Sequence, residues 1–225
     1  MSKYSQYIDK LLKNALFKQI SADTLENLIE FEACILGQYK KNALIVQESD
    51  HCYAIGFILK GILSIHQSSS SGENITIELL KEGESFGAGV LLSSEPFYRY
   101  NILANSDADI LYIPFAQIKR MLRENAVFNT NYITFLSDKL LVFKNKIEIL
   151  AKKNVRTRII TYLSSEIKKS SSLTIKIPHS KTQIAQLIGV ARPSLSRELQ
   201  CMQQEKLLKF DHNTITILKP EIFLP

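Results

Sequence analysis

Several residue types are scarce in this chain of 225 residues, and each scarcity excludes a class of protein. The three cysteines, Cys34, Cys52 and Cys201, lie far apart, which excludes a disulfide scaffold, a C-x-x-C redox pair and a zinc or iron–sulfur ligand set. No run approaches the roughly 18 consecutive apolar residues that a membrane-spanning helix needs, and the charged first ten residues contain no apolar signal segment. We therefore expect a cytoplasmic protein that is neither exported nor bound to a membrane.

The residues that are present suffice for a folded core, and their charge is unevenly distributed. Apolar residues make up 45% of the chain and charged residues 22%. Residues 1–150 hold 15 basic and 17 acidic side chains, whereas residues 151–225 hold 13 and 5, a net charge of +8. A local excess of this size favours a polyanionic partner such as nucleic acid. Taken alone, it fits a solvated basic surface equally well.

The spacing of apolar residues changes along the first half of the chain. Residues 8–36 place them at helical steps of three and four, with Ser21 as a cap between two helices. From about Tyr39, short apolar runs separated by glycines predict strands. These runs are 44–46, 53–59, 62–66, 75–80 and 110–113. Short strands punctuated by glycines indicate a small antiparallel barrel or roll.

A heptad seam follows the last of these strands. Its apolar residues alternate in steps of three and four, and they are Ile133, Leu136, Leu140, Phe143, Ile147 and Leu150. So narrow a stripe is typical of two helices that pair with each other, and we therefore expect a homodimer; packing within one chain is the alternative. A further helix is predicted at 155–169.

The basic C-terminal part contains the pattern of a helix-turn-helix. Residues 180–183 form a capping box that opens one helix, and Gly189 provides the backbone freedom for a tight turn into a second. Leu195, Leu199 and Met202 face inward, while the opposite face presents Pro193, Ser196, Arg197 and Gln200, with Arg192 at the leading end. Such arginines suit the reading of guanine in the major groove. An ordinary helical hairpin with surface arginines is the alternative. Strands at 207–210 and 214–218 then predict a wing.

At this point the whole chain resembles the cyclic-AMP receptor protein and FNR (Crp/Fnr) family of bacterial transcription regulators. The motifs that carry the resemblance include Phe57–Gly61, Gly83–Gly87, Ile184–Gly189 and Arg192–Leu199. The resemblance implies an α+β fold with an N-terminal double-stranded β-helix of the cyclic-nucleotide-binding type, a long dimerisation helix and a C-terminal winged helix-turn-helix. We assign residues 1–124 to effector sensing, 125–151 to dimerisation and 152–225 to DNA binding.

The resemblance also implies which residues contact double-stranded DNA. Phosphate contacts are expected from Ser180, Lys181 and Thr182. Contacts to base edges or nearby backbone are expected from Arg192, Ser194, Ser196 and Arg197, within a recognition helix at 191–204 that reads an inverted-repeat operator. RNA polymerase is a further partner if the protein is an activator. Pro193 stands where many members carry a base-reading glutamate, so the operator of those members does not transfer.

The effector region departs from the family pattern in two places. In members that bind cyclic nucleotides, the glycine matching Gly87 is followed by a glutamate that binds the ribose, and this position is Ala88 here. Arg99 is a candidate for the arginine that pairs with the cyclic phosphate, although counting back from Pro114 puts Tyr98 in that register. We expect cyclic AMP to bind weakly or not at all, because a buried carboxylate–hydroxyl pair is lost. The effector is unidentified, and no cofactor or metal is expected.

Two further hypotheses stay open on the residues alone. The roll can serve as a dimer platform that needs no ligand, in a regulator with the same fold. A cupin-like barrel enzyme would need clustered histidine and carboxylate ligands, and the roll offers only His51 and His66, without a His-x-His pair. We therefore do not expect an enzyme.

Overall fold

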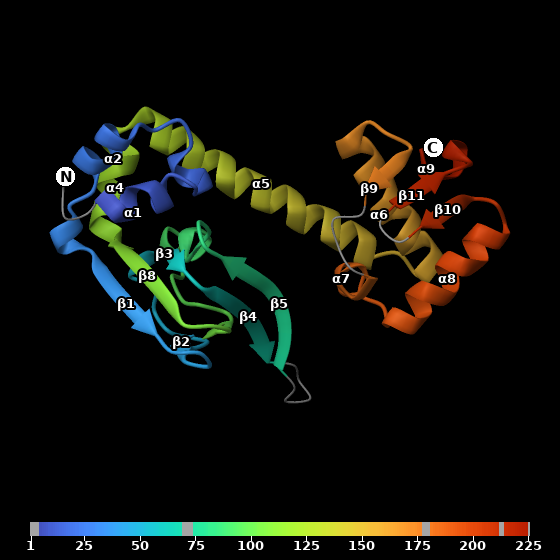
Figure 1. Cartoon of the computed structure of the whole chain (residues 1–225), viewed down its shortest axis with the longest axis horizontal. Helices are drawn as coiled ribbons and strands as arrows, with labels where there is room; N and C mark the ends of the chain where they lie inside the picture. The colour runs from blue at the N-terminus through green and yellow to red at the C-terminus, as the bar shows by residue number, and fades with distance from the viewer. Residues whose placement is uncertain (1–4, 69–73, 177–180, 212–213, 225) are drawn as a thin grey trace. The chain divides into compact units, whose positions relative to one another are not determined.

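The computed structural model describes residues 5–68, 74–176, 181–211 and 214–224. The chain divides into two compact units, Met1–Ser137 and Asp138–Pro225, and the division falls within one long helix, α5 (Ala126–Leu150) (Figure 1). The predicted α+β class, with a roll, a long helix and a C-terminal helix-turn-helix, is confirmed. Among the described residues, no helix is long and apolar enough to cross a membrane.

The first unit is a roll of two four-stranded antiparallel sheets with helices around it (Figure 1). One sheet has the order β1-β8-β3-β6, formed by Ile35–Tyr39, Ala108–Pro114, Ala54–Lys60 and Ser85–Phe86. The other has the order β2-β7-β4-β5, formed by Leu44–Val46, Asn101–Ala104, Ile62–Ser68 and Asn74–Lys81. The helices are α1 (Ser5–Leu11), α2 (Ala22–Leu28), α3 (Ala88–Leu91) and α4 (Phe115–Glu124), with 3-10 turns at Ala15–Phe17 and Phe31–Ala33.

The predicted helical stretch at 8–36 is wrong at its C-terminal end. Ser21 does cap α2, since its hydroxyl accepts a hydrogen bond from the Thr24 N–H at 3.2 Å, but the helix ends at Leu28. The backbone N–H and C=O of Glu30 then form hydrogen bonds with the buried side chain of Gln117, at 3.0 and 2.8 Å. These two groups therefore have a partner that is distant in sequence rather than one in a continued helix. Strand β1 begins at Ile35, within the stretch predicted as helix.

The second unit packs helices against a three-stranded antiparallel sheet. Its helices are α6 (Val155–Ser170), α7 (Lys181–Leu187), α8 (Arg192–Gln204) and α9 (Pro220–Phe223). The sheet has the order β10-β11-β9, formed by Leu208–Asp211, Thr214–Ile217 and Thr174–Lys176. The predicted wing hairpin is confirmed as β10 and β11, whereas β9 was not predicted. His212 and Asn213, between β10 and β11 in the sequence, lie outside the described residues.

Candidate nucleic-acid interface

Helices α7 and α8 form a tight helical pair around the turn at Gly189. This glycine has a φ of +65°, which fits the tight turn that the sequence predicted there, and a Cβ would lie 2.5 Å from Leu150 Cδ2. The Val190 N–H closes the turn by donating to the Ala185 carbonyl at 2.9 Å. The predicted inward residues of α8 are buried in the core of this unit, and they are Leu195, Leu199 and Met202.

The outer face of α8 is open to solvent at its N-terminal half. Arg192, Pro193, Ser194, Arg197 and Gln200 are exposed, and Ser196 is half-buried. Pro193 lies in the first turn, where a missing N–H costs no helical hydrogen bond. Of α7, Lys181 is half-buried and Thr182 exposed, while Ser180, the predicted cap, lies outside the described residues. Six of the seven residues predicted to bind DNA thus lie at exposed or half-buried positions of the α7–α8 pair, and Lys181 and Ser196 border the same hollow.

Arg156 of α6 anchors α8 through two carboxylates, Glu198 and Glu205, a role that the sequence did not predict. Its Nε donates to Glu198 Oε1 at 2.5 Å, and its two Nη atoms bind both carboxylate oxygens of Glu205 at 2.8 and 2.6 Å. The hydrogen bond from Arg156 lowers the pKa of Glu205, which stays charged at neutral pH. Because Arg156 binds these two carboxylates, they are not paired with Arg192 or Arg197.

Arg158, two residues further along α6, supports the turn. Its Nη1 donates to the carbonyls of Ile188 and Gly189, at 3.2 and 2.8 Å. Its Nε and Nη2 donate to the carbonyls of Lys152 and Leu150, at 3.0 and 3.1 Å. One guanidinium therefore joins the C-terminal end of α5 to the turn before α8.

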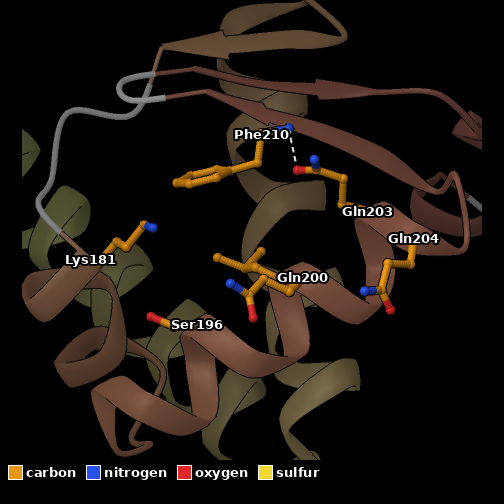
Figure 2. Close-up of a pocket in the computed structure, with 7 residues that line it drawn as sticks. Lys181, Ser196, Gln200, Gln203, Gln204 and Phe210 are labelled. Atoms are coloured by element: carbon orange, nitrogen blue, oxygen red, sulfur yellow. Dashed lines mark hydrogen bonds between the residues drawn. The ribbon is translucent and has the colours of Figure 1, made fainter.

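A hollow of about 630 Å³ lies beside α8, between α7 and the wing (Figure 2). It is lined by Lys181, Ser196, Leu199, Gln200, Gln203, Gln204 and Phe210. The Lys181 ammonium lies over the Phe210 ring, 4.3 Å from its centroid, and the Phe210 N–H donates to Gln203 Oε1 at 3.3 Å. Sequence reasoning missed Phe210 and Gln203, because β10 carries no local signal that it borders α7.

The residues of the predicted seam form an exposed apolar row along α5. Their exposed fractions run from 36% at Leu136 to 69% at Leu140. The row comprises Ile133, Leu136, Leu140, Phe143, Ile147 and Leu150. Such a continuous row on one helix is an apolar surface of the kind that another helix covers.

Of the three residues predicted to bind an effector, Gly87 and Ala88 lie in the interior of the roll, whereas Arg99 lies at its surface. Gly87 has a φ of +87° and precedes α3, and the Ala88 side chain is buried. The Ala88 carbonyl accepts a hydrogen bond from the Tyr132 hydroxyl at 2.7 Å. Arg99 points instead to solvent and pairs with Glu95. Of the two candidates for the phosphate-binding register, the structure therefore places Tyr98, not Arg99, beside Gly87.

Tyr98 and Cys52 occupy the space in front of Gly87. The Cys52 thiol donates to the Tyr98 hydroxyl at 3.2 Å, and a Cβ on Gly87 would lie 2.9 Å from that hydroxyl. Burial raises the pKa of both side chains, so both are uncharged at neutral pH. No group of three or more His, Cys, Asp or Glu side chains that could hold a metal occurs among the described residues.

Comparisons with known proteins match both units. A model of the cyclic nucleotide-binding domain matches residues 36–125, and a model of the Crp-like helix-turn-helix domain matches residues 157–222. The Global nitrogen regulator of Nostoc sp. is 27% identical over 218 residues, which cover 94% of each chain. The cAMP-activated global transcriptional regulator CRP of Pasteurella multocida is 19% identical and covers 82% of this chain and 90% of its own.

A solved structure shares the fold as well. The catabolite activator protein of Thermus thermophilus has a TM-score of 0.57 at 19% identity, with 93% of this chain and 98% of that chain covered. Both the roll and the helix-turn-helix thus have counterparts in one known architecture.

Proposed function

This chain belongs to the Crp/Fnr family of transcription regulators, and from that premise we propose that it acts as a homodimer which reads an inverted-repeat operator through α8. We assign residues 1–124 to effector sensing, 125–151 to dimerisation and 152–225 to DNA binding. As a regulator that binds DNA, it would act in the cytoplasm and carry out no catalysis. RNA polymerase would be a partner if it activates transcription.

The exposed arginines of α8 are the observation that carries the proposal. Arg192 and Arg197 lie on the solvent-facing side of the helix, and their side chains form no ion pair with the described residues. A free guanidinium can donate to guanine O6 and N7 together, which distinguishes guanine from the other bases. Ser194 and Ser196 add hydroxyls on the same face, while Lys181, Thr182 and Ser180 would contact phosphates.

The seam and the roll have separate roles in this proposal. The row from Ile133 to Leu150 would pair with its copy, since a dimer with two-fold symmetry presents two recognition helices to two half-sites. The roll would modulate DNA affinity through an unidentified effector near Gly87 and Ala88. Tyr98, packed in front of Gly87, also suits a regulator that needs no ligand.

Removing both arginines tests the proposal. Operators are selected from random duplexes, and the affinities of the Arg192→Ala/Arg197→Ala variant for a selected operator and for random DNA are compared by fluorescence anisotropy. Each lost guanine contact should cost about 1–3 kcal/mol on the operator and relax sequence preference. Lys168→Ala/Lys176→Ala removes the same charge from exposed positions on α6 and β9, so it should weaken both DNAs alike.

The proposal is wrong if the arginine variant discriminates operator from random DNA as well as the wild type does. The basic C-terminal part would then be a nonspecific charged surface.

A further inference from the structure

We propose that the hollow between α7, α8 and β10 holds a DNA backbone phosphate, and that Phe210 of the wing is the residue that positions Lys181 there (Figure 2). The inference rests on the proposed function, since it assumes that α8 lies in the major groove. It places the phosphate contact expected of Lys181 in a particular hollow, and it adds Phe210 as a positioning residue that the helix-turn-helix pattern does not contain.

The lining of the hollow suits an anion. Its seven residues include one cation, Lys181, and no carboxylate. Ser196 and Gln200 contribute a hydroxyl and a side-chain amide from α8, and Figure 2 shows both side chains on the side of the hollow that Lys181 borders. The nearby acid Glu198 is held by Arg156 on the other side of α8. Hydroxyl, amide and ammonium groups are the donors that DNA phosphates accept from.

Lys181 needs a second group to hold its ammonium in place. A lysine side chain has four rotatable bonds and loses considerable rotamer entropy when it is fixed. No ion pair between Lys181 and the described residues holds it, and the contact that orients it is the Phe210 ring at 4.3 Å. A cation over an aromatic face keeps its charge and its donors, so the ammonium stays available to a phosphate.

Phe210 is itself fixed to the recognition helix. Its N–H donates to Gln203 Oε1 at 3.3 Å, and it pairs with Ile215 across the β10–β11 hairpin. Lys209, the residue before it, is exposed and points to the opposite side of the strand. The wing therefore presents an aromatic face, not a charge, to the hollow, and Lys209 offers a matched control.

Salt dependence of binding to a random duplex of about 30 base pairs measures the phosphate contact, because each neutralised phosphate contributes about 0.9 to the slope of log K against log salt. Lys181→Ala should lower the slope by about 0.9 for each protomer that contacts DNA. Phe210→Leu keeps apolar bulk in the wing but removes the aromatic face, and it should weaken binding about two- to fivefold per protomer. Phe210→Tyr should restore wild-type binding.

A double-mutant cycle separates positioning from mere stabilisation of the wing. In the Lys181→Ala background, Phe210→Leu should have no further effect, whereas Lys209→Ala should weaken binding equally in both backgrounds. An equal loss of DNA affinity from Phe210→Leu with and without Lys181 would show that Phe210 only stabilises the wing.

A salt-dependence slope that Lys181→Ala leaves unchanged would overturn the phosphate site itself while leaving base reading by Arg192 and Arg197 intact. Inorganic phosphate that shifts the Lys181 side-chain NMR signals at constant ionic strength, without an effect of Lys181→Ala on DNA, would assign the hollow to a free anion and overturn the DNA site.

Discussion

At the scale of single residues, the interior of the roll decides which ligands it can accept. Ala88 offers a methyl group at the position where the family resemblance implies a ribose-binding carboxylate, and its carbonyl accepts a hydrogen bond from Tyr132. Tyr98 and Cys52 form a hydrogen bond with each other beside Gly87. The arginine nearest in sequence, Arg99, is paired with Glu95 at the surface. Arg99, the candidate for the phosphate-binding arginine, is therefore not placed at Gly87 to neutralise a cyclic phosphate.

We expect neither cyclic AMP nor cyclic GMP to bind with submicromolar affinity. Each charged hydrogen bond that is not made costs about 1.5–3 kcal/mol, and both the ribose and the phosphate lose one. Isothermal titration calorimetry measures the affinity, with a cyclic-AMP-activated relative as the positive control. Saturable submicromolar binding to this chain would mean that other groups of the roll take the place of the missing carboxylate at position 88 and of the arginine that pairs with the phosphate.

The sequence predicted those residues whose role depends on near neighbours. Gly189 was identified from its place between two apolar stripes, and its positive φ confirms the turn. The roles of Arg156 and Phe210 could not be predicted because their partners are distant in sequence. Arg156 binds residues 42 and 49 positions away, and the ring of Phe210 in β10 contacts Lys181 of α7. A basic residue on a helix and an aromatic residue on a strand have many possible partners, and only tertiary packing selects one.

At the scale of secondary-structure elements, the same distinction holds for strands. Of the five strands predicted in the roll, four lie within β2, β4, β5 and β8, and the fifth, 53–59, begins one residue before β3. The missed strand β6 has two residues, and β7 has four. Strand β1 begins with the exposed Ile35, and it exists because its backbone pairs with β8, in the register Ile35 to Tyr112. A strand that depends on a distant partner leaves little periodicity of its own.

Helix α5 allows a controlled test of dimerisation. Leu140 and Phe143 lie on the seam and are 69% and 60% exposed, whereas Leu141 and Val142 lie off it and are 56% and 60% exposed. Replacing Leu140 and Phe143 by Glu would place like charges against each other across a two-fold axis, so this variant should be monomeric in light scattering. Leu141→Glu/Val142→Glu adds the same charge off the seam and should stay dimeric.

Two outcomes would contradict the seam. One is a wild-type monomer at roughly tens of micromolar, a concentration at which an obligate dimer stays associated. The other is dissociation by the Leu141→Glu/Val142→Glu pair with retention of the dimer in the Leu140→Glu/Phe143→Glu pair, which would move the interface to the opposite side of α5.

At the scale of the whole molecule, charge and symmetry act together. Residues 151–225 carry a net charge of +8, while residues 1–150 carry a small net negative charge, so attraction to DNA is concentrated in the C-terminal part. This attraction is independent of base sequence and screened by salt. Specificity for one operator would instead come from the base contacts of α8 and from the spacing at which a dimer presents its two copies.

A dimer of this kind should require a fixed spacing between its half-sites. Helix-turn-helix dimers bind half-sites about one helical turn apart, roughly 10 base pairs, because both recognition helices then enter major grooves on the same face of the duplex. Inserting about 5 base pairs, half a turn, between the half-sites of a selected operator turns one of them to the far face. We expect the affinity of the wild type, measured by electrophoretic mobility shift, to fall to that for a single half-site. The Leu140→Glu/Phe143→Glu variant should bind both operators equally, since a monomer reads one half-site at a time. If the wild type binds both with equal affinity, its two recognition helices are not held in a fixed register by the dimer.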